Sequence, residues 1–241
     1  MTMMKPEIRA VLFDKDGTLI DYERSWGATN RRAAALAAPG DEALEKRFLE
    51  LGGVDPQSGR TRANSLFAAG NTREIAACFA EAGSPVAVEE LVAALDRLFV
   101  ASVDDAVPVA DLREVFGALR KAGLVIGIAS SDSETAIRAM VERFGIADFV
   151  AFIAGYDSGY GTKPGPGMVT AFAHATGLSP KEIAVVGDNL HDMHMASAGG
   201  AGLRVAVLTG TGDRISLSAE SDLCLPSIQS LQATLLLPLP G

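Results

Sequence analysis

The stretch AVLFDKDGT, residues 10–18, places two carboxylates directly after a short apolar run. The run at 10–13 has the length of a strand and is apolar throughout, which indicates a strand covered on both faces. Asp14 and Asp16 then follow where this strand enters a loop. Neighbouring anions repel each other unless a cation or a shared proton neutralises them, so the stretch predicts a metal site, acid–base chemistry, or both. A strand followed by a plain polar turn also fits, since Asp-Gly is a common turn pair.

The second half of the chain repeats this pattern of short apolar runs. Four more runs of strand length occur, at residues 124–129, 149–154, 183–186 and 203–208. From residue 124 onward they alternate with amphipathic stretches, which is typical of a parallel sheet flanked by helices. We therefore expect an α/β fold with a parallel sheet.

Residues 22–106 have a different character, rich in Ala, Leu, Glu and Arg and without a convincing strand. Helical periodicity predicts four helices there, near residues 25–38, 41–51, 72–82 and 88–103. We predict a helical domain at 22–106 that is inserted into a core formed by 1–21 and 107–241.

Two further segments have irregular patterns. Gly-Gly, Asp-Pro and Ser-Gly pairs interrupt residues 52–70, which we predict to be a long loop. Long loops are often functional, so candidate substrate contacts in and just after it are Arg60, Arg62, Ser65, Asn71 and Thr72. The apolar residues 235–241 are expected to fray at the end of the chain.

Composition and charge exclude several classes of protein. The 241 residues are 48% hydrophobic and 21% charged, as in a folded globular protein. A net charge of −9 argues against nucleic acid, although a metal and one Lys can still form a local pocket for a small anion. No apolar window is long enough to span a membrane, and Cys78 and Cys224 lack a ligand or disulfide spacing. These features favour a cytoplasmic protein and no membrane partner; the sequence does not indicate an oligomeric state.

Polar residues follow the second strand. Ser130 and Ser131 come directly after the run that ends at Ala129, at the sheet edge where open parallel sheets bind ligands. The Ser130 hydroxyl and the Ser131 amide could hold a phosphate. The same segment, with Asp132 and Ser133, could instead cap a helix that begins at Glu134.

One Lys lies in a stretch that prolines and glycines hold out of regular structure. Lys163 belongs to the segment GTKPGP, residues 161–166. A positioned ammonium neutralises both a carboxylate nucleophile and a phosphate. A solvated loop lysine is the alternative.

The strand at 183–186 leads into a second acidic pair, Asp188 and Asp192, in the segment GDNLHD. Carboxylates and phosphate oxygens are the ligands that Mg²⁺ prefers, so we predict a magnesium site. Helix capping by Asp188, with Asp192 on the first helical turn, also fits. His191 and His194 have no third nitrogen or sulfur ligand at a recognisable spacing, so a transition-metal site is rejected, and Trp26 is expected to be a packing or surface residue.

The order of these motifs resembles the haloacid dehalogenase superfamily. DxDGT, a Ser after the second strand, a loop Lys before Pro, and GDxxxD follow one another over nearly the whole chain. The resemblance implies a doubly wound, Rossmann-like core with an inserted α-helical cap domain. The helical insert after the first motif resembles the subgroup that includes phosphoglycolate phosphatases, beta-phosphoglucomutases and the dehalogenases.

The resemblance also implies a role for each motif residue. Asp14 would be the nucleophile that accepts the phosphoryl group, and Asp16 the acid and base. Ser130, Ser131 and Lys163 would hold the phosphate. The Mg²⁺ ligands would be Asp14, the backbone carbonyl of Asp16, Asp188, and Asp192 directly or through water.

We therefore expect a Mg²⁺-dependent phosphatase that hydrolyses a small phosphomonoester, such as phosphoglycolate, through an aspartyl phosphate. Asp16 favours phosphate esters, because halide expulsion requires no proton donor. A phosphosugar phosphatase or beta-phosphoglucomutase-like mutase is the first alternative, although the mutase branch typically has His where this chain has Trp26. The second alternative is a non-catalytic module that binds phosphate or a partner.

Overall fold

A computed structural model describes residues 7–231 and 234 of the chain. One sheet of six parallel strands forms its centre, in the order β3-β2-β1-β4-β5-β6. The strands are β1 Ala10–Phe13, β2 Val125–Ala129, β3 Val150–Ala154, β4 Ile183–Gly187, β5 Leu203–Val207 and β6 Leu223–Leu225. Successive strands are added towards one edge of the sheet up to β3 and towards the other edge from β4 onward. The switch point lies between β1 and β4, and ligands of doubly wound folds bind at such a point.

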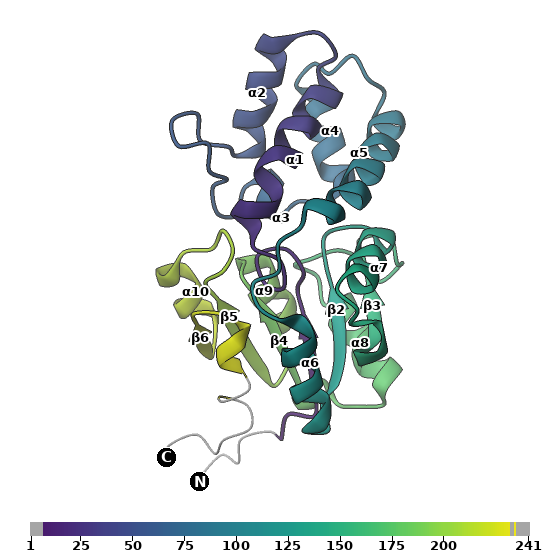
Figure 1. The fold of residues 1–241 in the computed structure, drawn as a ribbon, viewed down its shortest axis with the longest axis vertical. Coiled ribbons are helices and arrows are strands. Elements are labelled where there is room, and N and C mark those ends of the chain that lie inside the picture. The colour runs from purple at the N-terminus through teal and green to yellow at the C-terminus, as the bar shows by residue number, and fades with distance from the viewer. Residues whose placement is uncertain (1–6, 232–233, 235–241) are drawn as a thin grey trace.

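Helices cover both faces of the sheet (Figure 1). They are α6 Leu112–Lys121, α7 Glu134–Arg143, α8 Gly167–Thr176, α9 Leu190–Ala198 and α10 Arg214–Glu220. Side chains of β1 alternate between the two faces: Val11 and Phe13 join the cluster that contains α6 and α7, whereas Ala10 and Leu12 join that of α8 and α9. The predicted α/β fold with a doubly wound parallel sheet is confirmed.

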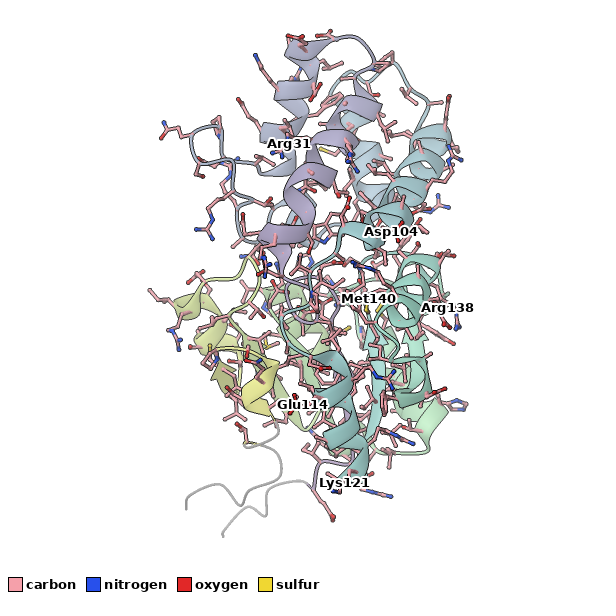
Figure 2. The ribbon with its side chains drawn as sticks, viewed as in Figure 1. Arg31, Asp104, Glu114, Lys121, Arg138 and Met140 are labelled. Carbon is pink, nitrogen blue, oxygen red and sulfur yellow. The ribbon has the colours of Figure 1, made fainter. Side chains whose placement is uncertain are left out.

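Helix α7 illustrates how the distribution of polar and apolar side chains orients the helices that cover the sheet. Met140 is fully buried, while Arg138 lies on the exposed face (Figure 2) and pairs with Glu134 one turn earlier, at 2.7 Å. The apolar stripe of the helix therefore faces the sheet. Short 3₁₀ turns complete the core and its connections, at Val103–Asp105, Ala147–Phe149, Pro180–Glu182 and Ile228–Ser230.

Five helices lie between β1 and α6 and stand above the sheet in Figure 1. They are α1 Tyr22–Ala37, α2 Glu42–Gly52, α3 Leu66–Ala69, α4 Thr72–Glu81 and α5 Val88–Ser102. Their buried side chains form a separate apolar cluster, in which Phe48 stacks on Phe79 with ring centroids 4.5 Å apart. This separate cluster supports our proposal that 22–106 is an inserted cap domain.

The two connections between core and cap run side by side. Asp21 donates its backbone N–H to Val107 O at 2.8 Å, and Val107 N–H donates to the Ser25 hydroxyl at 3.0 Å. On the core side, the Arg143 guanidinium of α7 donates to Ala106 O at 2.6 Å and also to Val103 O. The outgoing and returning connections are thus bonded to each other and to the core.

The structure differs from the sequence-based expectation in two segments. The segment 52–70 is not a continuous loop, because it contains α3 and an antiparallel bridge between Val54 and Thr61. Strand β6 was not predicted, since three residues are too short to give a periodicity signal. The expectation for 235–241 lies outside the described residues. Among the residues that are described, no helix is both long and apolar enough to cross a bilayer.

Replacing Phe116 by Ala should lower the free energy of unfolding by about 3–5 kcal/mol, because the lost ring leaves a cavity. Phe116 is fully buried on α6 and stacks on Phe13, with ring centroids 5.2 Å apart. Urea unfolding followed by circular dichroism measures the change. The control Ile215→Ala, at a side chain that is 85% exposed, should change stability by less than about 0.5 kcal/mol. Equal losses in the two variants would contradict this description of the core.

Candidate active site

The loop after β1 places Asp14 at the switch point of the sheet. The Asp14 backbone N–H donates to Val186 O of β4 at 2.8 Å, which ties the start of the loop to the neighbouring strand. Gly17 has φ +83°, and a Cβ at this position would lie 2.5 Å from the Asp188 carboxyl group. A residue with a side chain is therefore excluded at Gly17 on both conformational and steric grounds.

Lys163 reaches this loop from the segment between β3 and α8. Its Nζ lies 2.5 Å from Asp14 Oδ1 and 2.6 Å from Asp192 Oδ1, and the residue is only 6% exposed. Burial by itself lowers the pKa of Lys163, but the two carboxylates outweigh it and raise the pKa above its usual value. The ammonium is thus charged and fixed, and the solvated alternative is wrong.

The segment after β4 supplies the second acidic pair. Asn189 is the N-cap of α9: its side chain accepts from His191 N–H, while Asp192 Oδ2 accepts from Asn189 N–H at 3.1 Å. Asp188 therefore does not cap the helix. Its Oδ2 accepts instead from Thr211 N–H at 3.0 Å, in the loop after β5.

Three carboxylates converge at the end of β1 and β4. One oxygen from each of Asp14, Asp188 and Asp192 can be chosen so that all lie within 4.8 Å of one another. Burial, followed by repulsion from Asp14 and Asp192, raises the pKa of Asp188 well above its usual value. Burial also raises the pKa of Asp14 to about 7, although Lys163 partly offsets this effect. A hard divalent cation would remove the repulsion, so this donor set fits Mg²⁺.

The Asp16 carboxylate lies outside this group of three and has other partners. Its Oδ1 accepts from Trp26 Nε1 at 2.6 Å, and Lys15 Nζ lies 2.7 Å from the same oxygen. The predicted metal contact of Asp16 is through its backbone carbonyl, so the position of its side chain does not test it.

The serines after β2 divide between two roles. Ser133, not Ser130, is the N-cap of α7 and accepts from Ala136 N–H at 3.3 Å. The buried Ser130 hydroxyl accepts from Asp132 N–H at 3.1 Å, and the Ser131 hydroxyl donates to Ala69 O of the insert at 3.2 Å. Ser130 and Ser131 both line the cavity described next.

A cavity lies between the sheet edge and the helices of the insert. The core contributes Asp14, Asp16, Ser130, Ser131, Asp132, Lys163, Asp188, Asn189, His191 and Asp192. The insert contributes mainly apolar and aromatic side chains: Tyr22, Trp26, Phe67, Ala68, Ala69, Ile75 and Phe99, with Asn30, Gly70 and Thr72. The structure thus brings all the predicted catalytic, phosphate-binding and metal-ligand residues together at one cavity.

Of the predicted loop contacts, only Thr72 lines this cavity among the described residues. Three of the other four have polar partners elsewhere, whereas the Ser65 hydroxyl has no hydrogen-bond partner within the described part of the chain. Arg60 lies 3.6 Å from Glu23, Arg62 donates to Gly53 O, and Asn71 caps α4; Ser65 occupies the N-cap position of α3.

The group of polar contacts around the Asp16 carboxylate was not predicted: it consists of Lys15, Trp26 and Asp132, which pairs with Lys15. Trp26 is not merely a packing residue, since its N–H reaches Asp16 across the boundary between insert and core. Lys15 was visible inside the DKDGT stretch, but its spacing gives no sign of a partner in the loop after β2. His194 is exposed and lies 4.0 Å from Glu220, so it does not join His191 at the cavity.

Known proteins resemble this chain over almost its whole length. The phosphoglycolate phosphatase of Escherichia coli is 27% identical over 259 aligned residues, covering 96% of this chain and 94% of the relative. That of Salmonella typhimurium is 28% identical, with the same coverage.

Solved structures share the fold. A predicted phosphoglycolate phosphatase from Haemophilus somnus superposes with a TM-score of 0.71 at 16% identity, over 96% of this chain and 99% of that one. CbbY from Rhodobacter sphaeroides, solved in complex with phosphate, gives a TM-score of 0.69 at 19% identity, over 93% and 96% of the two chains. The sequence family described as haloacid dehalogenase-like hydrolase matches residues 8–200. The chain therefore belongs to the haloacid dehalogenase-like hydrolase family.

Proposed function

We propose that this hydrolase is a Mg²⁺-dependent phosphatase that cleaves a small phosphomonoester through an aspartyl phosphate on Asp14. The observation that carries the proposal is the buried Asp14 carboxylate at the switch point, held by Lys163 beside two further carboxylates. An oxygen nucleophile that is already fixed in this way loses little further conformational freedom on reaching the transition state.

The proposed reaction has two steps. Asp14 attacks phosphorus, the bond to the leaving oxygen breaks, and Asp16 gives that oxygen a proton. Water then attacks the aspartyl phosphate and gives a proton to Asp16. This second step releases phosphate and restores the Asp14 carboxylate. The proton that leaves Asp16 in the first step is thereby returned in the second.

Asp14, the backbone carbonyl of Asp16 and Asp188 would hold the Mg²⁺, with Asp192 as a direct or water-mediated ligand. When bound, the ion supplies charge neutralisation between an anionic nucleophile and an anionic phosphate. Asp192 already binds Lys163 and the Asn189 amide, which supports the water-mediated contact.

The phosphate itself would lie against Ser130, Ser131 and Lys163. The Ser130 oxygen accepts from the Asp132 amide and so keeps its own proton for a phosphate oxygen. Lys163 adds a charged donor that stays protonated between its carboxylate partners.

The partner would be a small phosphorylated metabolite, and phosphoglycolate comes first because the curated relatives act on it by name. Among the described residues that line the cavity, Lys163 is the sole Lys or Arg. A sugar bisphosphate carries a second phosphate that would need its own cations, which makes mutase activity the weaker alternative. We propose a cytoplasmic location, which the free thiols of Cys78 and Cys224 support.

Asp14→Asn should abolish the hydrolysis of 4-nitrophenyl phosphate, because the amide of Asn is a poor nucleophile and does not form the covalent intermediate. Release of nitrophenolate is measured with and without Mg²⁺. Equal rates for wild type, Asp14→Asn and Mg²⁺-free protein would contradict the enzymatic proposal and favour a non-catalytic binding module.

Mg²⁺ should raise the thermal midpoint of the wild type, by the equivalent of about 2.7 kcal/mol at 100 times its dissociation constant. Asp188→Asn should remove most of this stabilisation, because it deletes an anionic ligand. Differential scanning fluorimetry across a Mg²⁺ titration measures both. Asp213→Asn is the matched control, since Asp213 caps α10 and does not line the cavity. A Mg²⁺-induced shift of the midpoint that is as large in the Asp188 variant as in wild type would count against the metal site.

A substrate panel should rank phosphomonoesters with a single phosphate group above sugar bisphosphates in kcat/KM. Phosphate release from phosphoglycolate, glycerol phosphate and a sugar bisphosphate is measured with malachite green, and chromatography detects isomerised sugar. The formation of an isomer with no net phosphate release would favour the mutase alternative.

A further inference from the structure

Lys15 is a buried cation beside the cavity that the proposed chemistry does not use. Its side chain is 2% exposed. Its Nζ lies 2.7 Å from Asp16 Oδ1, 2.6 Å from Asp16 Oδ2 and 3.1 Å from Asp132 Oδ2. It also lies 5.3 Å from the centroid of the Trp26 ring. An ammonium removed from water to this extent is costly unless its partners are well placed.

The partners of Lys15 offset the cost of its burial. The carboxylates of Asp16 and Asp132 both contact the ammonium. The aromatic face of Trp26 adds a smaller attraction.

Asp132 forms a rigid support for this pair. Its Oδ1 accepts from Ser133 N–H at 2.9 Å, its backbone N–H donates to Ser130, and its backbone O accepts from Tyr156 N–H at 3.0 Å. The residue is 6% exposed. These three hydrogen bonds fix the position of Asp132. Its carboxylate therefore holds the Lys15 ammonium from the loop after β2.

The Asp16 carboxylate is consequently bound from two sides. Lys15 contacts both of its oxygens from the core, and Trp26 Nε1 donates to Oδ1 from α1 of the insert. Two contacts that do not lie on one line fix the rotation of a carboxylate, which a single contact would leave free. Asp16 still lines the cavity with Asp14.

We propose that Lys15, supported by Asp132, is a positioning residue that holds the Asp16 carboxyl group for proton exchange with the leaving oxygen and then with water. The inference rests on the proposed function, since it assigns Asp16 the acid–base role. Lys15 itself does not contact the substrate and transfers no proton.

A purely structural ion pair predicts a different outcome. If Lys15 only stabilised the loop, its loss would slow every substrate by a similar factor. Loss of a correctly held acid acts selectively: 4-nitrophenolate leaves as an anion without help, whereas the less acidic phenol requires a proton. The dependence of kcat/KM on the leaving group therefore separates the two roles, since kcat/KM covers only the steps through loss of the leaving group.

The test compares phenyl phosphate with 4-nitrophenyl phosphate in wild type, Lys15→Met and Asp132→Asn, with Mg²⁺ present. Lys15→Met should lower kcat/KM for phenyl phosphate on the order of 10²-fold and for 4-nitrophenyl phosphate by less than about 3-fold. Asp132→Asn keeps Lys15 and the side-chain shape, and should show the same selectivity with a smaller loss. Arg204→Met is the matched control: it breaks the Arg204–Asp222 pair, with 2.9 Å between Nη2 and Oδ1, away from the cavity, and should change neither value.

An equal loss on both substrates in either variant, or no loss, would overturn the role of Lys15 while leaving the phosphatase intact. Should Lys15→Met fail to fold, the selectivity of Asp132→Asn decides. If the wild type hydrolyses neither ester, the proposed function fails, and this inference fails with it.

Discussion

The Lys163 ammonium lies between the carboxylates of Asp14 and Asp192, and the rest of the site depends on this buried ion group. Three carboxylates lie beside one ammonium there, so the group is negative whenever all three are ionised. Removing one partner of a buried pair costs about 3–5 kcal/mol, because it leaves an uncompensated charge. Burial raises the pKa of Asp14, and repulsion from Asp192 adds to this effect, while the excess negative charge explains the fit of the donor set to a divalent cation.

The doubly wound topology is what brings these groups together. Asp14 follows β1, Asp188 follows β4, and Lys163 comes from the connection between β3 and α8, so chain segments far apart in sequence meet at one edge. Glycines permit the close approach: a Cβ on Gly17 would overlap the carboxyl group of Asp188, and one on Gly187 would overlap Asp192. The sheet thus fixes where these groups meet, and the absence of a side chain at Gly17 and Gly187 leaves room for the two carboxyl groups.

Much of this arrangement could be predicted from the sequence, because continuous apolar runs and polar residues at strand ends are local patterns. The first five strands and four of the insert helices were expected within about three residues of their observed ends. Strand β6 is three residues long and α3 four, too short for a periodic signal. The contact from Trp26 to Asp16 crosses from insert to core, and the pairing of Lys15 with Asp132 joins two separate loops. Such contacts depend on how elements are oriented in three dimensions, which residue spacing does not encode.

The bonded connections at Asp21 and Val107 have a consequence for the shape of the cavity. Two adjacent segments that are hydrogen-bonded to each other fix where the insert leaves the core and where it returns. Arg143 binds the returning segment at Ala106. Because α1 begins directly after this junction, the junction sets where Tyr22 and Trp26 lie relative to the carboxylates. A change in the backbone of the junction would therefore alter the cavity without replacing any side chain that lines it.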